Sequence, residues 1–332
     1  MANPVQDFIA VVIPCYRVKT HILDVLQKIG PECSRIYIID DGCPDATGKF
    51  VEENCSDIRV KVIYNSCNEG VGGAVIRGYL SAMQDGAMVI VKIDGDGQMD
   101  PAFIPQFVTP ILSGEADYVK GNRFYNPEDI QGMPLTRVLG NAALSFFSKL
   151  SSGYWNIFDP TNGYTAIHTA LVMTLPLHKI SKDYFFETDM LFRLGTLRAR
   201  VIDMPMQSVY LDENSNLSIK KIAPYFISGH LRNLYKRILY SYFLRDFSVA
   251  SLEIVFGIIL LLFGTVFGIV EWIAHARNGT YASTGTVMLA SLPILTGIQM
   301  LISAVNFDIR NIPDRPVHKQ LWLLQSRKKG PK

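Results

Sequence analysis

The stretch Val89-Ile90-Val91-Lys92-Ile93-Asp94-Gly95-Asp96-Gly97-Gln98 joins an apolar run to a short acidic motif. The apolar run is typical of a buried strand, and it ends in two carboxylates separated by one glycine. Residues two apart in an extended segment point the same way, so Asp94 and Asp96 can converge on one ligand. With the Gln98 amide oxygen they form a set of hard donors that suits Mg²⁺ or Mn²⁺. We therefore predict a divalent-metal site here; an acidic loop that only closes a strand is the alternative.

Upstream of this stretch, strand-like and helix-like segments alternate. We expect strands in four apolar runs, at residues 8–13, 35–39, 58–64 and 88–93, with Pro14 ending the first. We expect helices between them, at residues 21–29, 44–51 and 72–83. This alternation predicts an α/β domain with a mostly parallel, Rossmann-like sheet. In such sheets the ligand crevice lies at the carboxyl ends of the strands.

Polar residues follow the predicted strands at the ends where we expect a ligand. Tyr16 follows the first strand, Asp41 the second and the segment 68–74 the third. A divalent cation would let acidic strand ends bind a diphosphate, while Asp41 could accept hydrogen bonds from a nucleotide base or a sugar hydroxyl. Turn chemistry is the alternative for residues 40–42. The glycine-rich segment 68–74 matches neither common phosphate-binding signature, and close packing of a helix start explains it equally well.

Composition restricts the class of protein and its compartment. The chain has 332 residues and a net charge of +2, so nothing indicates a nucleic-acid partner. Its apolar content of 48 % is high for a soluble enzyme, and the excess lies late in the chain. The absence of a basic, apolar start predicts no signal peptide. An odd number of cysteines without C-x-x-C predicts reduced thiols in the cytosol, at Cys15, Cys33, Cys43, Cys55 and Cys67.

These motifs, in this order, resemble those of the family 2 GT-A glycosyltransferases. More narrowly, they resemble the polyprenyl-phosphate glycosyltransferases related to dolichol-phosphate mannose synthase. The resemblance rests on residues 12–16, 40–42, 68–74 and 94–101 and extends over residues 8–310. It implies a GT-A catalytic domain that uses Mg²⁺ or Mn²⁺ to move a hexose-type sugar, with inversion, from a UDP- or GDP-sugar to a polyprenyl (undecaprenyl or dolichyl) phosphate. Arg17 and Val18 depart from the family pattern, in which Asn and Glu are common.

The resemblance also assigns roles to individual residues. It implies that the nucleotide-sugar is held by Pro14, Tyr16, Asp41, Asn68, Gly70 and Asp94. It implies that the metal is held by Asp94, Asp96 and Gln98, with Asp96 as the most direct ligand. Catalytic roles are assigned to Asp96, Arg123, Arg137, Asp159, Glu187 and Asp189.

Two arginines lie in the part of the chain expected to bind the acceptor. Residues 117–123 predict a further strand that ends at Arg123, and Arg137 follows fourteen residues later. Guanidinium groups bind phosphate bidentately, so both residues suit a lipid phosphate or the diphosphate. Ordinary surface arginines are the alternative. The segment 159–164, which begins with Asp159, resembles a family segment on the acceptor side.

Glu187 and Asp189 lie among apolar residues, in a region where many relatives have a general base. Capping of a helix N-terminus would explain both carboxylates as well. A lipid phosphate is already largely ionised at neutral pH, since its second pKa lies near about 6. A base would then contribute little, and the metal and the arginines would carry most of the catalysis.

The last third of the chain is predicted to contact a membrane. Residues 219–243 combine apolar positions at helical spacing with Lys and Arg, which predicts an interfacial helix rather than one packed only on the domain. Residues 249–272 and 286–305 are long and apolar enough to cross a bilayer. Gly257 and Gly264 suit contacts between these two helices. A buried helical hairpin in a soluble protein is the alternative.

We therefore expect four parts: a catalytic domain at 1–211, a linker with interfacial helices at 212–247, two membrane helices within 248–306 and a basic tail at 307–332. Basic residues precede the first span and follow the second, which predicts a cytosolic catalytic domain and cytosolic termini. We expect an integral protein of the bacterial plasma (inner) membrane, assembled as a homo-oligomer, specifically a tetramer. The tail is expected to be mobile.

Two other functions stay open. The first is transfer to a hydroxyl of a glycan, although processive synthases carry more spans and a Q-x-x-R-W motif that this chain lacks. The second is a non-catalytic sensor of nucleotide-sugars, against which the intact Asp94 and Asp96 pair argues. The residues do not identify the sugar, the nucleotide base or the polyprenol.

Overall fold

The computed structural model describes residues 8–125, 135–206 and 219–321. The chain divides into two compact units. The first, here called the sheet unit, comprises Met1–Leu234 and Pro313–Lys332. The second, here called the hairpin unit, comprises Tyr235–Ile312.

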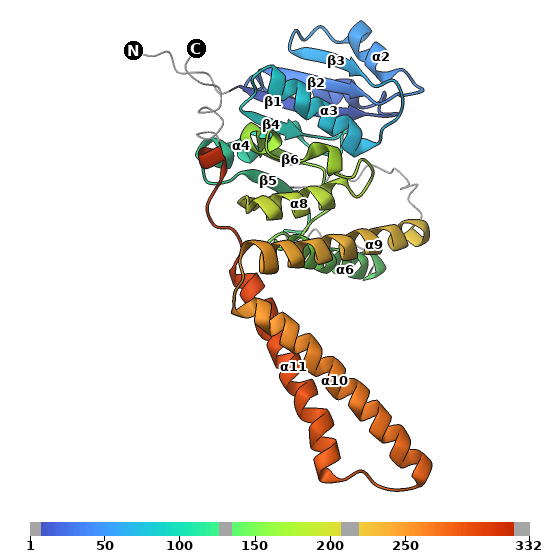
Figure 1. Cartoon of the computed structure of the whole chain (residues 1–332). Coiled ribbons are helices and arrows are strands. Elements are labelled where there is room, and N and C mark those ends of the chain that lie inside the picture. The colour runs from blue at the N-terminus through green and yellow to red at the C-terminus, as the bar shows by residue number, and fades with distance from the viewer. Residues whose placement is uncertain (1–7, 126–134, 207–218, 322–332) are drawn as a thin grey trace. The chain divides into compact units, whose positions relative to one another are not determined.

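The sheet unit contains seven strands within the described residues, surrounded by helices (Figure 1). The strands are β1 (Ile9–Cys15), β2 (Arg35–Asp40), β3 (Val60–Tyr64), β4 (Val89–Lys92), β5 (Tyr118–Asn122), β6 (Thr165–His168) and β7 (Val201–Pro205). The helices are α1 (Ile22–Gln27), α2 (Thr47–Asn54), α3 (Val71–Gln84), α4 (Ile104–Leu112), α6 (Leu135–Ser152), α7 (Thr169–Val172) and α8 (Phe186–Leu197). Helix α9 (Ile219–Ile238) begins in this unit, and two 3₁₀ turns occupy Pro101–Phe103 and Leu177–Lys179.

The strand order is β3-β2-β1-β4-β6-β5-β7. Every pairing is parallel except the two made by β6, which runs antiparallel to β4 and β5. The prediction of a mostly parallel α/β sheet is therefore confirmed. The carboxyl ends of the six parallel strands meet the amino end of β6 at one edge of the sheet, which we call the carboxyl edge.

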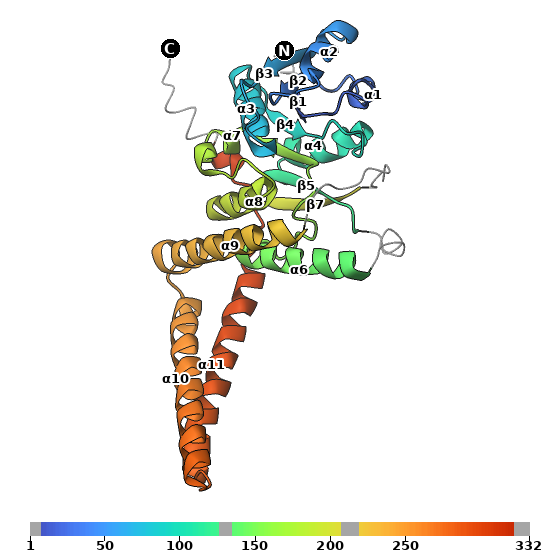
Figure 2. The same ribbon diagram turned by 90° about the vertical axis from the view of Figure 1, so that its right-hand side faces the viewer.

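Strands β1, β2 and β4 are buried on both faces because most of their side chains are apolar, many of them β-branched. Ile9, Val11 and Ile13 share a core cluster with residues of α1 and α4. On the opposite face, a Cβ atom added to Gly78 of α3 would collide with Val12. Helices α1 and α4 thus cover one face and α3 the other, as Figure 2 shows.

Strand β1 continues through Pro14 to Cys15, so the expectation that Pro14 ends this strand was wrong. Strand β4 pairs with β1 only as far as Val12, whereas Pro14 pairs with Ile39 of β2. Beyond Val12, β1 therefore has a neighbouring strand on one side only. A proline is tolerated at such a position because its missing N–H can face the open side.

The chain beyond α11 packs on the sheet unit through Asp117, a fully buried residue directly before β5. Asp117 accepts hydrogen bonds from the backbone N–H groups of Val317 (2.8 Å) and His318 (2.8 Å). The Nδ1 atom of His318 lies 2.7 Å from Asp117, and its ring stacks on His168 with centroids 4.3 Å apart. The expectation of a mobile tail is therefore wrong for these residues, while residues 322–332 lie outside the described part of the chain.

We expect the substitution Asp117→Ala to lower the melting temperature of the purified protein in detergent. The backbone N–H groups of Arg200, Val317 and His318 would lose a buried acceptor, which costs on the order of 3 kcal/mol. Glu115→Ala is the matched control, because Glu115 is exposed and two residues away. Equal melting temperatures for the two variants would contradict the anchoring role of Asp117.

The hairpin unit contains two long helices, α10 (Val249–Asn278) and α11 (Thr284–Arg310). Their most apolar 18-residue windows have mean hydropathies of 2.5 and 1.8, so both are long and apolar enough to cross a membrane. The helices approach closely at glycines, as predicted. A Cβ atom on Gly257 would lie 3.1 Å from the carbonyl oxygen of Gly297, and one on Gly264 would lie 2.6 Å from that of Ala290.

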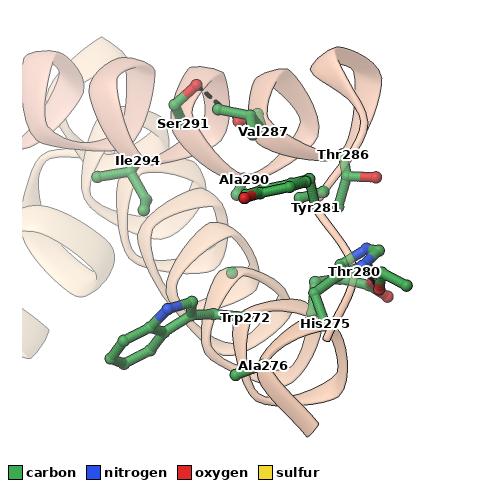
Figure 3. Close-up of a pocket in the computed structure, with 13 residues that line it drawn as sticks. Trp272, His275, Ala276, Thr280, Tyr281, Thr286, Val287, Ala290, Ser291 and Ile294 are labelled. Atoms are coloured by element: carbon green, nitrogen blue, oxygen red, sulfur yellow. Dashed lines mark hydrogen bonds and ion pairs between the residues drawn. The ribbon is translucent and has the colours of Figure 1, made fainter. Parts of the chain in front are cut away.

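Near the connecting loop, a solvent-open pocket of about 460 Å³ lies between α10 and α11 (Figure 3). Trp272 and His275 line it from α10, and Tyr281 lines it from the loop. His275 Nδ1 lies 2.8 Å from Thr280 Oγ1, which fixes the end of α10 to the loop.

At the other end of this unit, a buried ion pair joins the residues before α10 to the end of α11. Arg237 binds Asp308 through its two terminal guanidinium nitrogens, Nη1 at 2.7 Å and Nη2 at 3.0 Å. Tyr242, in the π-helical segment Leu239–Arg245, donates a hydrogen bond of 2.6 Å to the same carboxylate. This bidentate pair fixes the two helix ends to each other.

Candidate active site

The carboxyl edge brings together most of the residues that the sequence predicts for the site. Tyr16 follows β1, Asp41 follows β2, Asp94 follows β4 and Arg123 follows β5. The segment 159–164 reaches the same edge because it leads directly into β6, whose amino end lies there. Segments far apart in the sequence thus meet along one edge of the sheet, the edge at which ligands bind in open α/β sheets.

The loop after β2 is shaped by Asp40 and Cys43. Asp40 accepts hydrogen bonds from the backbone N–H groups of Cys43 (2.8 Å) and Gly48 (2.6 Å), so it has the turn role considered as the alternative. Arg17, one of the departures from the family pattern, adopts a left-handed φ of 60°. Its backbone N–H donates to Cys43 Sγ at 3.1 Å, which joins the β1 loop to the β2 loop beside the half-exposed Tyr16.

Asp41 joins the β2 loop to the glycine-rich segment. One carboxylate oxygen accepts from Asn65 Nδ2 (2.7 Å) and Glu69 N (2.9 Å), and the other accepts from Gly70 N (2.9 Å). Asn68 Oδ1 also accepts from Gly70 N at 2.9 Å. Gly70 has a φ of +83°, a conformation that glycine adopts without strain. The structure therefore shows Asp41 and Asn68 shaping this segment.

Asp94 and Asp96 have different surroundings although they are two residues apart. Asp94 Oδ1 lies 2.8 Å from Nζ of Lys92, whose side chain is only 2 % exposed. The same ammonium lies 3.2 Å from Oε1 of Glu187 in α8. Asp94 and Glu187 therefore share the single positive charge of Lys92.

Asp96 supplies the second carboxylate of the motif. It is half-buried, and its Oδ1 accepts the backbone N–H of Gln98 at 3.0 Å. Mg²⁺ and Mn²⁺ bind hard carboxylate oxygens, and Mg²⁺ usually takes one or two of them and completes its shell with water and substrate phosphate. The carboxylate of Asp96 and the amide oxygen of Gln98 belong to this donor class. The ion pair with Lys92 makes Asp94 a weaker candidate for direct coordination.

Arg123 and Asp159 form a bidentate ion pair at the same edge. Arg123 Nε lies 2.7 Å from Asp159 Oδ2, and Arg123 Nη2 lies 3.0 Å from Oδ1. Asp159 is almost fully buried, whereas the Arg123 side chain is 28 % exposed. Beside this pair, Asp203 of β7 accepts from Phe158 N (3.0 Å) and Asn122 Nδ2 (2.9 Å), and burial raises the pKa of Asp203 to about 6.

Glu187 and Asp189, the two candidate bases, both lie in the first turn of α8. Asp189 is fully buried and accepts from the backbone N–H of Ser181 (3.0 Å) and from Asn233 Nδ2 of α9 (2.9 Å). These hydrogen bonds connect the first turn of α8 to α9, which is a structural role for Asp189. Arg137 lies in α6, and its side chain is outside the described residues.

Two buried lysines at this site were missed by the sequence reasoning. Strand register places Lys92 of β4 and Lys120 of β5 on either side of Thr165 of β6, so all three side chains share one face of the sheet. Lys120 donates a hydrogen bond to the carbonyl oxygen of Asn162, and burial lowers the pKa of Lys120 to about 8. A lysine inside an apolar, buried strand was the available signal, because such a charge requires a partner.

Comparison with known proteins agrees with this geometry. The sequence model for "Glycosyl transferase family 2" matches residues 10–175, which is half of the chain. The chain is 30 % identical over 221 residues to a UDP-N-acetylglucosamine–dolichyl-phosphate N-acetylglucosaminyltransferase of Methanococcus voltae, covering 62 % of this chain and 88 % of that protein. It is 31 % identical over 186 residues to an undecaprenyl-phosphate mannosyltransferase of Micrococcus luteus, covering 55 % of this chain and 75 % of that protein.

A solved structure shows the same fold at lower identity. Glucosyl-3-phosphoglycerate synthase from Mycobacterium tuberculosis, solved with Mn²⁺, uridine diphosphate and glucosyl-3-phosphoglycerate, superposes with a TM-score of 0.51 and 20 % identity. The superposition covers 70 % of this chain and 80 % of that one. The predicted GT-A fold is thereby confirmed, as is the resemblance on which it rested. The chain belongs to glycosyl transferase family 2.

Proposed function

We propose that this chain is a membrane-anchored glycosyltransferase that moves a hexose-type sugar from a UDP- or GDP-sugar to a polyprenyl phosphate, with inversion and with Mg²⁺ or Mn²⁺. One observation supports this most directly. The carboxyl edge holds a carboxylate suited to a metal, Asp96, and a guanidinium suited to a phosphate, Arg123. The same chain carries two helices long enough to cross a membrane. The two relatives, a dolichyl-phosphate and an undecaprenyl-phosphate sugar transferase, suggest a lipid phosphate as acceptor.

On the donor side, we assign the nucleotide to the loops after β1, β2 and β3, at Pro14, Tyr16, Asp41, Asn68 and Gly70. Asp96 and Gln98 would hold the cation, and Asp94 would contact the donor beside it. A bound divalent ion would neutralise charge on the diphosphate leaving group. The Mn²⁺ and uridine diphosphate in the M. tuberculosis structure support this donor chemistry.

On the acceptor side, we assign the lipid phosphate to Arg123 and Arg137. Asp159 holds the Arg123 guanidinium through a bidentate pair, which fixes the orientation in which it can meet a phosphate. An oxygen of the ionised phosphate would attack the anomeric carbon while the bond from that carbon to the diphosphate breaks. The attacking oxygen carries no proton to remove, so this displacement needs no strong base.

We therefore expect Glu187→Gln to lower the turnover number by less than about tenfold. Glu187 pairs with Lys92, and an ionised phosphate acceptor has no proton that a base would need to remove. Initial rates of lipid glycosylation at saturating donor measure this effect. Asp189→Asn is the comparison for a purely structural carboxylate in the same helix turn. An inactive Glu187→Gln enzyme with normal nucleotide binding would indicate an acceptor that must be deprotonated, such as a glycan hydroxyl.

We also propose that the sheet unit lies in the cytosol of a bacterial cell, with the hairpin unit in the plasma membrane. The hydrogen bonds from Val317 and His318 to Asp117 support the topological part of this proposal. The chain enters the hairpin from the sheet unit and returns to that unit afterwards, as two membrane crossings require. A reporter inserted in residues 279–283 tests the orientation, and a cytosolic signal there would refute it.

The deciding experiment is incubation of the purified full-length protein with Mn²⁺, undecaprenyl phosphate and a panel of UDP- and GDP-sugars. Mass spectrometry of the lipid fraction should reveal one polyprenyl-monophosphate sugar. Nucleotide binding without any lipid product would favour the sensor alternative, and a product only with added glycan would favour hydroxyl transfer. Native mass spectrometry of the same sample tests the proposed homotetramer.

A further inference from the structure

Lys92 is a deeply buried charge in contact with the proposed active site. It is the last residue of β4, between Val91 and Ile93, and its side chain is 2 % exposed. A buried ammonium is stable only when carboxylates compensate its charge. Here two carboxylates do so, Asp94 at 2.8 Å and Glu187 at 3.2 Å.

The two partners of Lys92 belong to different parts of the site. Asp94 opens the D-x-D segment on the donor side. Glu187 lies 93 residues later in the chain, in the first turn of α8, and its side chain is 10 % exposed. The ammonium is therefore a direct electrostatic link between two segments that no strand pairing connects.

A third segment packs on this ion pair through Gly163. A Cβ atom added to Gly163 would collide with Lys92 Nζ and would lie 2.5 Å from Asp94 Oδ2. The backbone of the acceptor-side segment 159–164 therefore passes directly over the ion pair. This contact gives a physical reason for glycine at position 163, because any side chain there would displace the lysine or the carboxylate.

We propose that Lys92 is a positioning residue that holds the D-x-D segment, α8 and the segment 159–164 in one arrangement, so that the donor site forms correctly. This inference rests on the proposed function. Lys92 is too deeply buried to contact a substrate, and it acts through the position of Asp94. Without the ammonium, Asp94 and Glu187 would be like charges without a shared counter-ion, and their repulsion would move Asp94 away from the donor.

The test compares three variants of the full-length protein: Lys92→Met, Lys92→Met with Glu187→Gln, and Arg59→Met. Methionine removes the charge and keeps an unbranched apolar chain. Arg59 is the control, because it is a partly buried cation paired with Asp57 at 2.7 Å directly before β3, at the opposite end of the sheet from the carboxyl edge. Isothermal titration with UDP and with GDP, each in the presence of Mn²⁺, gives the dissociation constant. Melting temperatures report stability separately.

For Lys92→Met we expect the dissociation constant of the nucleotide to rise at least about tenfold, since removing one partner of a buried ion pair leaves uncompensated charge. The double variant should bind at an intermediate level, because Gln removes the repulsion but Asp94 still lacks its partner. Arg59→Met should lower the melting temperature and keep the dissociation constant within about twofold.

A dissociation constant for Lys92→Met within about twofold of the wild type would overturn the proposal, whatever its melting temperature. If Lys92→Met yields no folded protein, the double variant is compared with Glu187→Gln alone, and equal constants overturn the proposal. The proposed function fails separately: a wild type that binds neither nucleotide refutes the donor assignment. A wild type that binds nucleotide but glycosylates no lipid refutes only the acceptor, and the Lys92 comparison still stands.

Discussion

Replacing Asp96 with alanine is expected to abolish sugar transfer, with a loss of at least about 10³-fold in turnover, because the substitution removes the carboxylate best placed to hold the divalent cation. The neighbouring Asp94 cannot substitute for it, since its charge is already paired with Lys92. The fold should persist, because Asp96 lies after β4 and outside the buried cluster. Transfer of radiolabelled sugar to undecaprenyl phosphate measures the loss.

The matched control for this prediction is Asp100→Ala, in the same loop. Asp100 accepts the backbone N–H of Ala102 at 3.0 Å and caps the following 3₁₀ turn. We expect this variant to lose stability but to keep most of its activity and its dependence on Mn²⁺. Substantial activity in Asp96→Ala, with unchanged metal dependence, would show that the cation binds elsewhere.

Replacing Arg123 with glutamine is expected to lower turnover by on the order of 10²-fold or more, because the lipid phosphate loses a bidentate cationic partner. The same change leaves Asp159 buried without its counter-ion, which destabilises the protein by about 3 kcal/mol or more. Activity and stability therefore fall together in the single variant. Steady-state kinetics with varied lipid phosphate and a thermal melt record the two losses.

The double variant Arg123→Gln with Asp159→Asn separates these two effects. Both charges are then removed, so most of the stability should return while the activity stays low. Recovery of activity along with stability would show that Arg123 only neutralises Asp159. Arg123→Lys provides a further comparison, because a lysine keeps the charge but cannot form the planar, two-point contact.

The sheet and its ligand edge were predictable because their determinants are local. Apolar, β-branched runs such as residues 89–91 form strands wherever a sheet can bury both faces. Once the sheet is mostly parallel, the strand ends must share an edge, so Tyr16, Asp41 and Asp94 were placed correctly from the sequence. Pro14 was misjudged, since its tolerance depends on where the neighbouring strand β4 stops. The short strands β6 and β7 were not predicted.

The roles of individual carboxylates were harder to predict because they depend on partners that are distant in sequence. Asp94 and Asp96 look equivalent as a motif, yet Lys92 and Glu187 make their charges different. Asp189 looked like a second base, and its two partners, Ser181 and Asn233, are visible only after α8 and α9 have packed. Periodicity identifies buried positions, but it does not identify which side chains meet there.

The docking of Val317 and His318 on Asp117 also has a consequence for how the protein is made. These residues lie 200 and 201 positions after their acceptor, and α10 and α11 are both synthesised between them. On the ribosome, the part of the sheet unit that precedes the hairpin unit emerges first. It begins to fold while Asp117 still lacks these donors. Its last native hydrogen bonds form only after α10 and α11 have been translated. Completion of the sheet unit is thus coupled in time to synthesis of the hairpin unit. A chain truncated within the hairpin unit would leave the carboxylate of Asp117 without the donors Val317 and His318, a defect open to cellular quality control.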